Sequence, residues 1–157
     1  MKNVKTNAIR ILGQKKAVFQ VHSYEPDGVS RTGVEVAELL GQETAAVYKT
    51  LVTCGKSGAN YVFVIPVAAE LDLKKAAGAA GEKSIAMLKS RDLLNLTGYI
   101  HGGCSPIGMK KLFPTWIDRS AEARPTILVS GGRIGMHIEI SLSELRRVLP
   151  FQLAGLV

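Results

Sequence analysis

The chain has 157 residues, of which 46% are hydrophobic and 21% are charged. This balance excludes disordered and fibrous proteins, and the length predicts a single domain over residues 1–157. The sequence contains no apolar run of about 18 residues, the length needed to span a membrane, and its start lacks the apolar stretch of a secretory signal. We therefore expect a cytoplasmic protein with no membrane contact. The net charge of +7 suits a polyanionic partner without identifying it.

The first part of the chain predicts two helices with a strand between them. Apolar residues recur at helical spacing over 4–12, and the run 18–24 is rich in β-forming residues. Thr32 and Glu35 have the spacing of a capping box. The helix that they open is expected to end at Gly41.

The middle of the chain predicts a β-hairpin followed by a short helix. Strands are expected over 47–54 and 61–65, joined by a turn over 55–58. Asp72 is expected to begin a helix, because aspartate is a favoured cap at this point. The run 85–87 predicts another short strand.

The last part of the chain alternates between strands and helices. Ser90 is expected to cap a helix that closes at Gly98, and a Ser141–Glu144 capping box predicts a final helix over 142–148. Strands are expected over 115–117, 126–130 and 134–140, the last two joined by a turn at Gly131–Gly132. This interleaving of short helices with short strands predicts the α+β class, with a mixed sheet curled around the core.

The segment 97–108 is a candidate binding loop, because it contains four glycines and Pro106. Such a density of glycine lets a ligand approach the main chain closely, and free N–H groups there can point at an oxyanion. The alternative is a glycine-rich connection between two strands, which this segment by itself favours.

The common catalytic signatures do not match. Residues 103–107 fail the Gly-x-Ser-x-Gly pattern, and the histidines at 22, 101 and 137 have no metal-ligand spacing. Cys54 and Cys104 lie too far apart for a redox or zinc motif and are expected to stay reduced. Cys104 with His101 could form a thiol nucleophile and its base only if the fold brought them together.

Lys49 interrupts a run of apolar, strand-forming residues. Val47 and Leu51 share its side of the strand, so its ammonium is expected near an apolar face, where a charge is costly without a partner. One interpretation is a cation in a cleft that binds a polar substrate. The other is a lysine at a strand end whose flexible stem reaches water.

Five segments in order resemble the YbaK/EbsC family of aminoacyl-tRNA deacylases, which is related to the editing domain inserted in bacterial prolyl-tRNA synthetases. These segments are Val21–Glu25, Val47–Leu51, Leu71–Lys75, Thr97–Gly108 and Val129–Gly132. The resemblance covers nearly the whole chain. It implies a curled, barrel-like mixed sheet flanked by short helices, the fold of that editing domain.

The resemblance also implies a function and a set of site residues. It implies trans-editing hydrolysis of cysteine from tRNA(Pro), and also from tRNA(Cys), with aminoacyl-tRNA as partner, a complex with prolyl-tRNA synthetase, and no cofactor or metal. The residues implied are Lys49, Gly102 and Gly103 for catalysis, and Tyr24, Thr32, Ser105, Pro106, Ser130 and His137 for substrate binding. Some relatives carry aspartate where this chain has His137. Lys110 and Lys111 are the basic pair expected to contact tRNA.

Two routes of ester cleavage and three other functions stay open at this point. The thiolate of the bound cysteine could attack its own carbonyl, which needs no catalytic triad, or water could attack instead. Other functions are an Ala-tRNA(Pro) deacylase, a non-catalytic module that binds tRNA or a synthetase, and a structural or regulatory protein with a degenerate pocket.

Overall fold

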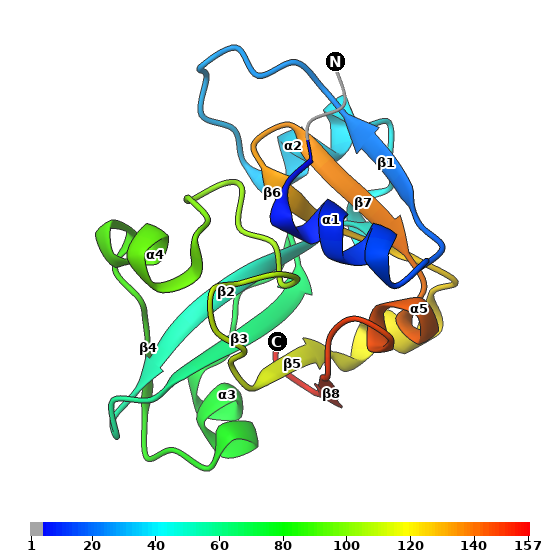
Figure 1. Ribbon diagram of the computed structural model, residues 1–157. Coiled ribbons are helices and arrows are strands. Elements are labelled where there is room, and N and C mark those ends of the chain that lie inside the picture. Colours follow the sequence, from blue (N-terminus) through cyan, green and yellow to red (C-terminus); the bar gives the residue numbers. More distant parts are fainter. Residues whose placement is uncertain (1–4) are drawn as a thin grey trace.

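The computed structural model describes residues 5–157 of the protein (Figure 1). Its helices are α1 (Asn7–Gln14), α2 (Gly33–Leu39), α3 (Leu73–Ala80), α4 (Ser90–Thr97) and α5 (Leu142–Arg146), with 3₁₀ turns η1 (Thr44–Ala46) and η2 (Arg119–Ala123). The strands are β1 (Gln20–Ser23), β2 (Tyr48–Gly55), β3 (Asn60–Pro66), β4 (Ile85–Met87), β5 (Thr115–Asp118), β6 (Ile127–Arg133), β7 (Met136–Ile140) and β8 (Gln152–Ala154). The predicted α+β class is confirmed.

The strands form two sheets. One has three strands in the order β1-β7-β6, and the other has five strands in the order β4-β2-β3-β5-β8. The larger sheet is mixed, because β3 pairs antiparallel with β2 and parallel with β5. A single parallel bridge between Val47 and Leu128 links the two sheets where β2 begins. The predicted barrel-like curl is not confirmed, since both sheets are open and the link between them is one bridge.

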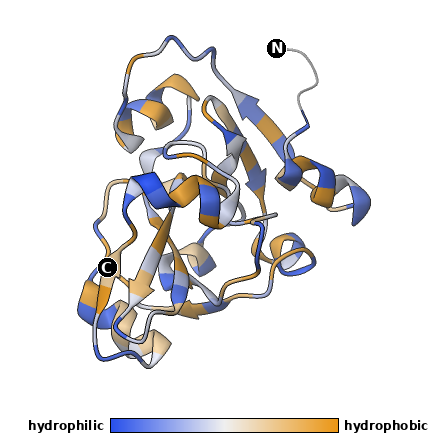
Figure 2. Ribbon diagram, turned by 60° about the vertical axis from the view of Figure 1, so that its left-hand side comes forward, coloured by the Kyte–Doolittle hydropathy of each residue, from blue (hydrophilic) through white to orange (hydrophobic). Residues whose placement is uncertain are grey.

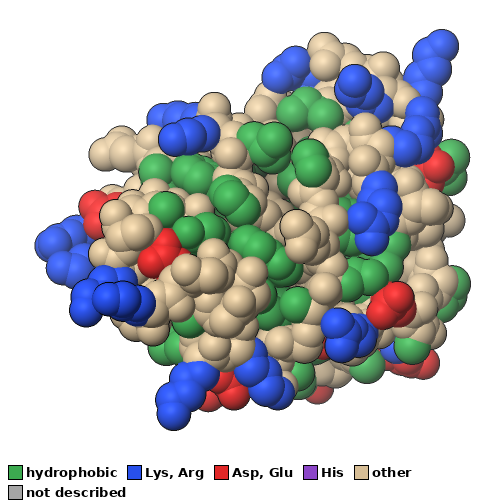
Figure 3. All heavy atoms as spheres, turned by 90° about the horizontal axis from the view of Figure 1, so that it is seen from below, with side chains coloured by type: hydrophobic (Ala, Val, Ile, Leu, Met, Phe, Trp, Pro, Cys, Tyr) green, Lys and Arg blue, Asp and Glu red, His purple; other side chains and the backbone are tan. Residues whose placement is uncertain are grey.

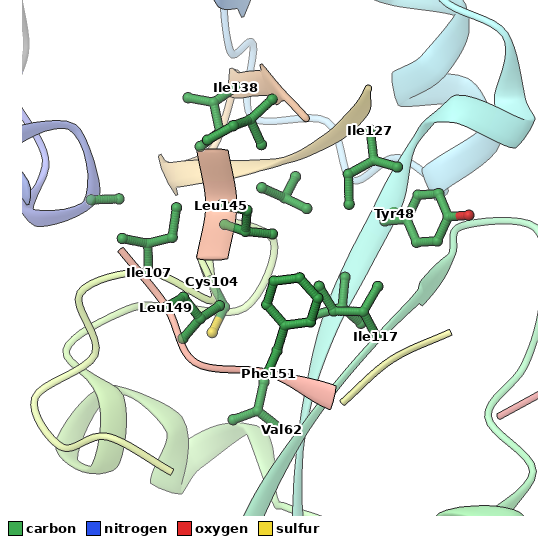
Figure 4. Packing of buried hydrophobic residues seen from close by; sticks show 14 of the residues in the cluster. Tyr48, Val62, Cys104, Ile107, Ile117, Ile127, Ile138, Leu145, Leu149 and Phe151 are labelled. Atoms are coloured by element: carbon green, nitrogen blue, oxygen red, sulfur yellow. The ribbon is translucent and has the colours of Figure 1, made fainter. Parts of the chain in front are cut away.

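The main core lies between the sheets and is closed by α1 and α5. It includes Val62 and Ile117 from the larger sheet and Ile138 from the smaller one, together with Leu145 of α5 (Figure 4). On α1, Ala8 and Leu12 are fully buried, and hydrophobic and hydrophilic residues alternate around this helix (Figure 2). Thr6 accepts a hydrogen bond from the Ile9 N–H and caps α1, while the predicted helix start at residue 4 lies outside the described residues.

Several local predictions are confirmed. β2 and β3 form the expected hairpin, and Thr32 and Glu35 make both bonds of the capping box on α2. Asp72 caps α3 by accepting from two backbone N–H groups, and Gly98 ends α4 in the left-handed conformation. The capping and helix-end signals are each contained within four residues of the sequence, and the hairpin joins two strands that are neighbours in the chain, so none of these features depends on distant packing.

Other local predictions are wrong. Ser90 is the first residue of α4, which follows Lys89 and has no side-chain cap. β6 continues through Gly131 and Gly132, whose register is shifted, and the turn comes after Arg133. A side chain at Gly131 would meet the Met136 side chain of β7 at 2.7 Å, and one at Gly132 would meet Tyr99 at 2.9 Å, so both glycines allow close packing.

The last capping box is only half formed, and the final strand was missed. Ser141 accepts from the Glu144 N–H, but the Glu144 carboxylate accepts from the Val18 N–H and from Arg147. These two donors take the place of the Ser141 backbone N–H, from which the Glu144 carboxylate was expected to accept. β8 has no signal in its own short sequence, because pairing with β5 defines it.

Candidate active site

A cavity of about 410 Å³ opens beside β2, between the two sheets and the glycine-rich loop. Its walls come from separate parts of the chain: β2, the segment before α2, the segment from β4 to α4, the loop after α4, and strands β6 and β7. Its lining residues are Tyr24, Arg31, Gly33, Val36, Val47, Tyr48, Lys49, Thr50, Leu51, Val52, Val67, Met87, Leu88, Ser90, Leu93, His101, Gly102, Cys104, Ser130 and His137.

β2 brings Lys49 to this cavity. The preceding residue, Tyr48, is buried in the core, where its hydroxyl lies 2.7 Å from the Ser120 hydroxyl. Lys49 is half-buried, and no hydrogen bond or ion pair joins its ammonium to any residue in 5–157. The Thr50 hydroxyl beside it is buried and also has no partner among these residues. Lys49 is therefore a cation that is available to a bound anion.

Ser130 and His137 lie opposite each other on β6 and β7, and both line the cavity. The same register places His22 of β1 on the other side of His137. His137 is 9% exposed, and its buried Nδ1 has no hydrogen-bond partner in the described part of the chain. Burial, helped by the nearby His22, lowers the pKa of His137 to about 4. The ring is therefore neutral near pH 7 and can accept a hydrogen bond, but it is a weak base.

This buried ring predicts a pH dependence of stability. The unfolded chain takes up a proton at His137 below its ordinary pKa of 6.5, whereas the folded protein resists protonation down to about 4. The free energy of unfolding should therefore fall as the pH falls through this window, by roughly 3 kcal/mol from this group. Urea unfolding of the wild type and His137→Gln across this range checks the effect. The variant should lose less stability on acidification, and parallel curves for the two proteins would contradict a buried neutral ring.

Within the glycine-rich loop, Gly102 lines the cavity and Gly103 does not. Gly102 has φ +86°, and its backbone N–H is not used by any hydrogen bond to the described residues. The Gly103 N–H donates to the Ile100 carbonyl at 3.0 Å, so it is not available to a substrate. Ser105 and Pro106, further along the same loop, are buried, and the Ser105 hydroxyl accepts from the Ile107 N–H at 3.2 Å. Of these four predicted residues, only Gly102 reaches the cavity.

The segment before α2 supplies a residue that sequence reasoning missed. Tyr24 lines the cavity as predicted, but Thr32 does not, because its hydroxyl caps α2 by accepting from the Glu35 N–H at 3.2 Å. Its neighbours Arg31 and Gly33 line the cavity instead. The capping box located this helix start, but it gave no signal for which adjacent side chain faces the cavity.

The predicted tRNA contacts Lys110 and Lys111 lie on the surface away from the cavity lining. The Lys110 ammonium is 3.4 Å from the Asn95 carbonyl, and Lys111 lies 5.9 Å from the centre of the Phe113 ring. Figure 3 shows one face of the molecule, on which Lys and Arg side chains are spread around the margin. The basic residues on this face do not form one continuous patch, and contact of this pair with tRNA stays a prediction.

Cys104 does not have the properties of a nucleophile. Figure 4 shows it among the apolar side chains of the core. Burial raises its thiol pKa to about 11, so the reactive thiolate is scarce at neutral pH. His101 is exposed, and no hydrogen bond between the two side chains is present in residues 5–157. The thiol–imidazole pair that the sequence allowed is not assembled here.

The cavity combines positive charge with neutral polar groups. Its charged side chains are Arg31 and Lys49, and no aspartate or glutamate is among its lining residues in the described range. The described residues contain no group of three or more His, Cys, Asp or Glu placed to hold a metal ion. None of the helices in 5–157 is long and apolar enough to cross a membrane. The arrangement can bind an anionic substrate and donate hydrogen bonds to a developing negative charge.

Comparisons with known proteins agree with this chemistry. Residues 28–148 match the model of the family described as aminoacyl-tRNA editing domain. The chain is 46% identical over 137 residues to a protein of Enterococcus faecalis that is provisionally named Cys-tRNA(Pro)/Cys-tRNA(Cys) deacylase EbsC. This match covers 87% of the chain and 84% of that protein.

Two solved structures share the fold over almost the whole chain. One is provisionally described as a trans-editing enzyme for prolyl-tRNA synthetase. It has a TM-score of 0.82 and 26% identity, and the match covers 98% of each chain. The other is the hypothetical protein APE2540, with a TM-score of 0.83 and 24% identity over 96% of this chain and 99% of that one.

Proposed function

The chain belongs to the aminoacyl-tRNA editing domain family, and we propose that it is a trans-editing deacylase that releases cysteine from Cys-tRNA(Pro) and also from Cys-tRNA(Cys). One observation carries the proposal. A single cavity contains Tyr24, Lys49, Gly102, Ser130 and His137, which come from distant parts of the sequence. The name of the Enterococcus faecalis relative supports cysteine as the amino acid that is removed.

The cavity favours a nucleophile supplied by the substrate. The Cys104 thiol is held protonated by burial, and His137, with a pKa of about 4, is a weak base. In the proposed step the thiol of the bound cysteine loses its proton, and its sulfur forms a bond to the ester carbonyl carbon. The bond from that carbon to the ribose oxygen breaks, and the ribose oxygen takes up a proton as tRNA leaves. Water then opens the resulting thiolactone to give free cysteine.

In this mechanism Lys49 and Gly102 stabilise negative charge. The Lys49 ammonium has no partner among residues 5–157, and the Gly102 N–H is equally free within them. Donors fixed in place before the reaction stabilise an oxyanion without reorganising, and each contributes about 2.7–4 kcal/mol in well-studied enzymes. The proposed role of Lys49 is to attract this charge, or that of the terminal nucleotide, and not to act as a general base.

A chemical requirement also explains selectivity. A pocket by itself separates side chains that differ by one methylene by only about 1–3 kcal/mol. A route that needs a side-chain thiol excludes alanine and proline regardless of fit. The competing route uses water, with His101 as the candidate base, because His101 also lines the cavity and is exposed.

A two-substrate deacylation assay tests the function. The protein is incubated with Cys-tRNA(Pro) and Ala-tRNA(Pro), and release of each amino acid is followed against buffer. We expect cysteine to be released rapidly and alanine at the buffer rate. Comparable release of both would replace the thiol route by the water route, and faster release of alanine would make the protein an Ala-tRNA(Pro) deacylase. Release of neither would reject the enzyme and leave a non-catalytic binding module.

We further propose that the protein acts in the cytoplasm with prolyl-tRNA synthetase as a partner. An enzyme that removed cysteine from every Cys-tRNA would waste correctly charged product. A synthetase that presents mischarged tRNA(Pro) would restrict the reaction. The description of the solved relative as a trans-editing enzyme for prolyl-tRNA synthetase supports this arrangement.

A further inference from the structure

Arg31 is a second cation of the cavity, and the structure fixes it in place. Its Nη2 donates to Asp27 Oδ2 at 2.5 Å, while Asp27 Oδ1 accepts from the Val29 N–H at 3.0 Å. Asp27 therefore ties the guanidinium to the backbone of its own loop. The side chain is 23% exposed, and its Nε is buried without a hydrogen-bond partner in the described residues.

The described residues that line the cavity carry positive charge and no negative charge. Arg31 and Lys49 both line it, and none of its described lining residues is acidic. Asp27, the ion-pair partner of Arg31, is not among the lining residues and is largely exposed. Asp27 compensates the Arg31 charge from outside the lining, whereas no described acidic residue does so inside it, so an anion that enters the cavity is attracted by both cations. The guanidinium suits a phosphate especially, because it presents a planar fork of donors.

We propose that Arg31 binds the phosphodiester nearest the acylated 3′ end of the tRNA. The inference rests on the proposed function, since it assigns the anion on the basis of an aminoacyl-tRNA substrate. Lys49 then stabilises negative charge at the ester, and Arg31 binds the RNA backbone, so the two cations of one cavity have different roles. Asp27 acts as a positioning residue that holds the guanidinium for this contact.

The chain contains a matched control arginine. Arg124 also forms one ion pair, with Glu43 at 3.1 Å, is 26% exposed, and has a buried Nε without a described partner. It differs from Arg31 in that it does not line the cavity. Arg31→Gln and Arg124→Gln therefore remove the same charge and a similar ion pair, but only the first removes a cation from the site.

The first test measures binding and needs no catalysis. The probe is a fluorescent single-stranded RNA that ends in CCA without an amino acid, and anisotropy gives its affinity at several salt concentrations. Arg31→Gln should weaken binding roughly ten- to hundred-fold, as expected for a hydrogen-bonded charge, and should reduce the salt slope by about one. Arg124→Gln should bind like the wild type. Equal weakening by both variants would overturn the proposal, because it would show a general effect of charge.

The second test separates the phosphate from the rest of the substrate. Arg31→Gln should raise KM for Cys-tRNA(Pro) with kcat unchanged, and it should cleave a cysteine ester of adenosine, which lacks phosphate, as fast as the wild type does. Slower cleavage of both substrates would overturn the phosphate assignment. If the wild type cleaves neither, the deacylase function fails, and the RNA-binding result still decides whether Arg31 contacts the backbone.

Discussion

Replacing Lys49 by alanine is expected to lower kcat/KM for Cys-tRNA(Pro) by about 10²–10³-fold, as loss of one oxyanion donor does in other enzymes. Lys49 is one of the residues that line the cavity, and its ammonium has no ion-pair partner among residues 5–157, so no other described group neutralises its charge. The fold should survive, because the residue is only half-buried. Steady-state deacylation kinetics measure the loss, and thermal unfolding checks stability.

Two further variants make this result specific to the ammonium. Lys49→Met keeps an unbranched side chain and removes the charge, so it should be as inactive as the alanine variant. Lys56→Ala removes an exposed lysine from the turn of the same hairpin and should leave the rate unchanged. Normal deacylation by Lys49→Met would remove Lys49 from the proposed mechanism.

Replacing Gly103 by alanine is expected to destabilise the protein by about 1–3 kcal/mol, the usual cost of forcing an extra carbon into a packed site. The added Cβ would lie 2.9 Å from the backbone of Arg133 and of Ile134. Backbone atoms cannot rotate away as the end of a side chain can, so the loop itself must move. Because Gly102 is the adjacent residue, we also expect slower deacylation.

Gly13→Ala is the matched control for this variant. Gly13 lies in α1, and a Cβ there meets no atom within 4 Å, so alanine should stabilise the helix by about 0.5–1 kcal/mol. Urea unfolding midpoints of the two variants should therefore shift in opposite directions from the wild type. A midpoint for Gly103→Ala equal to that of the wild type would show that the loop is not packed against the turn after β6.

Gly103 also shows how the sequence located the loop without identifying its role. Glycine density by itself favoured a plain connection between strands, and the family resemblance implied that residues 102–106 bind the substrate. In the structure its residues have different roles, since Gly102 lines the cavity, Gly103 allows close packing on Arg133, and the Ser105 hydroxyl accepts from the Ile107 N–H within the loop. The backbone of the distant turn after β6 lies against Gly103, whereas Gly102 has a positive φ and meets only the Ile134 side chain of that turn.

The opposite case is Arg31, which the sequence did not single out. Its importance depends on Asp27 holding it, on α2 beginning two residues later, and on Lys49 reaching the same space from a different strand. The sequence around each of these neighbours can be interpreted by itself, but it does not show that they meet at one cavity. Thr32 was chosen instead, although its capping role already used its hydroxyl.

The sequence by itself determined the α+β class, the β2–β3 hairpin, the Thr32 and Asp72 caps and the end of α4 at Gly98. The caps and the helix end depend on hydrogen bonds and φ preferences within a few residues, while the class and the hairpin follow from helical and strand-forming runs that are adjacent in the chain. Tertiary structure decided the division into two open sheets, the strand β8, the neutral state of His137, and the choice of Arg31 and Gly102 as cavity residues. Those features arise where segments far apart in the chain meet, because burial and pairing between such segments are energies that no local pattern records.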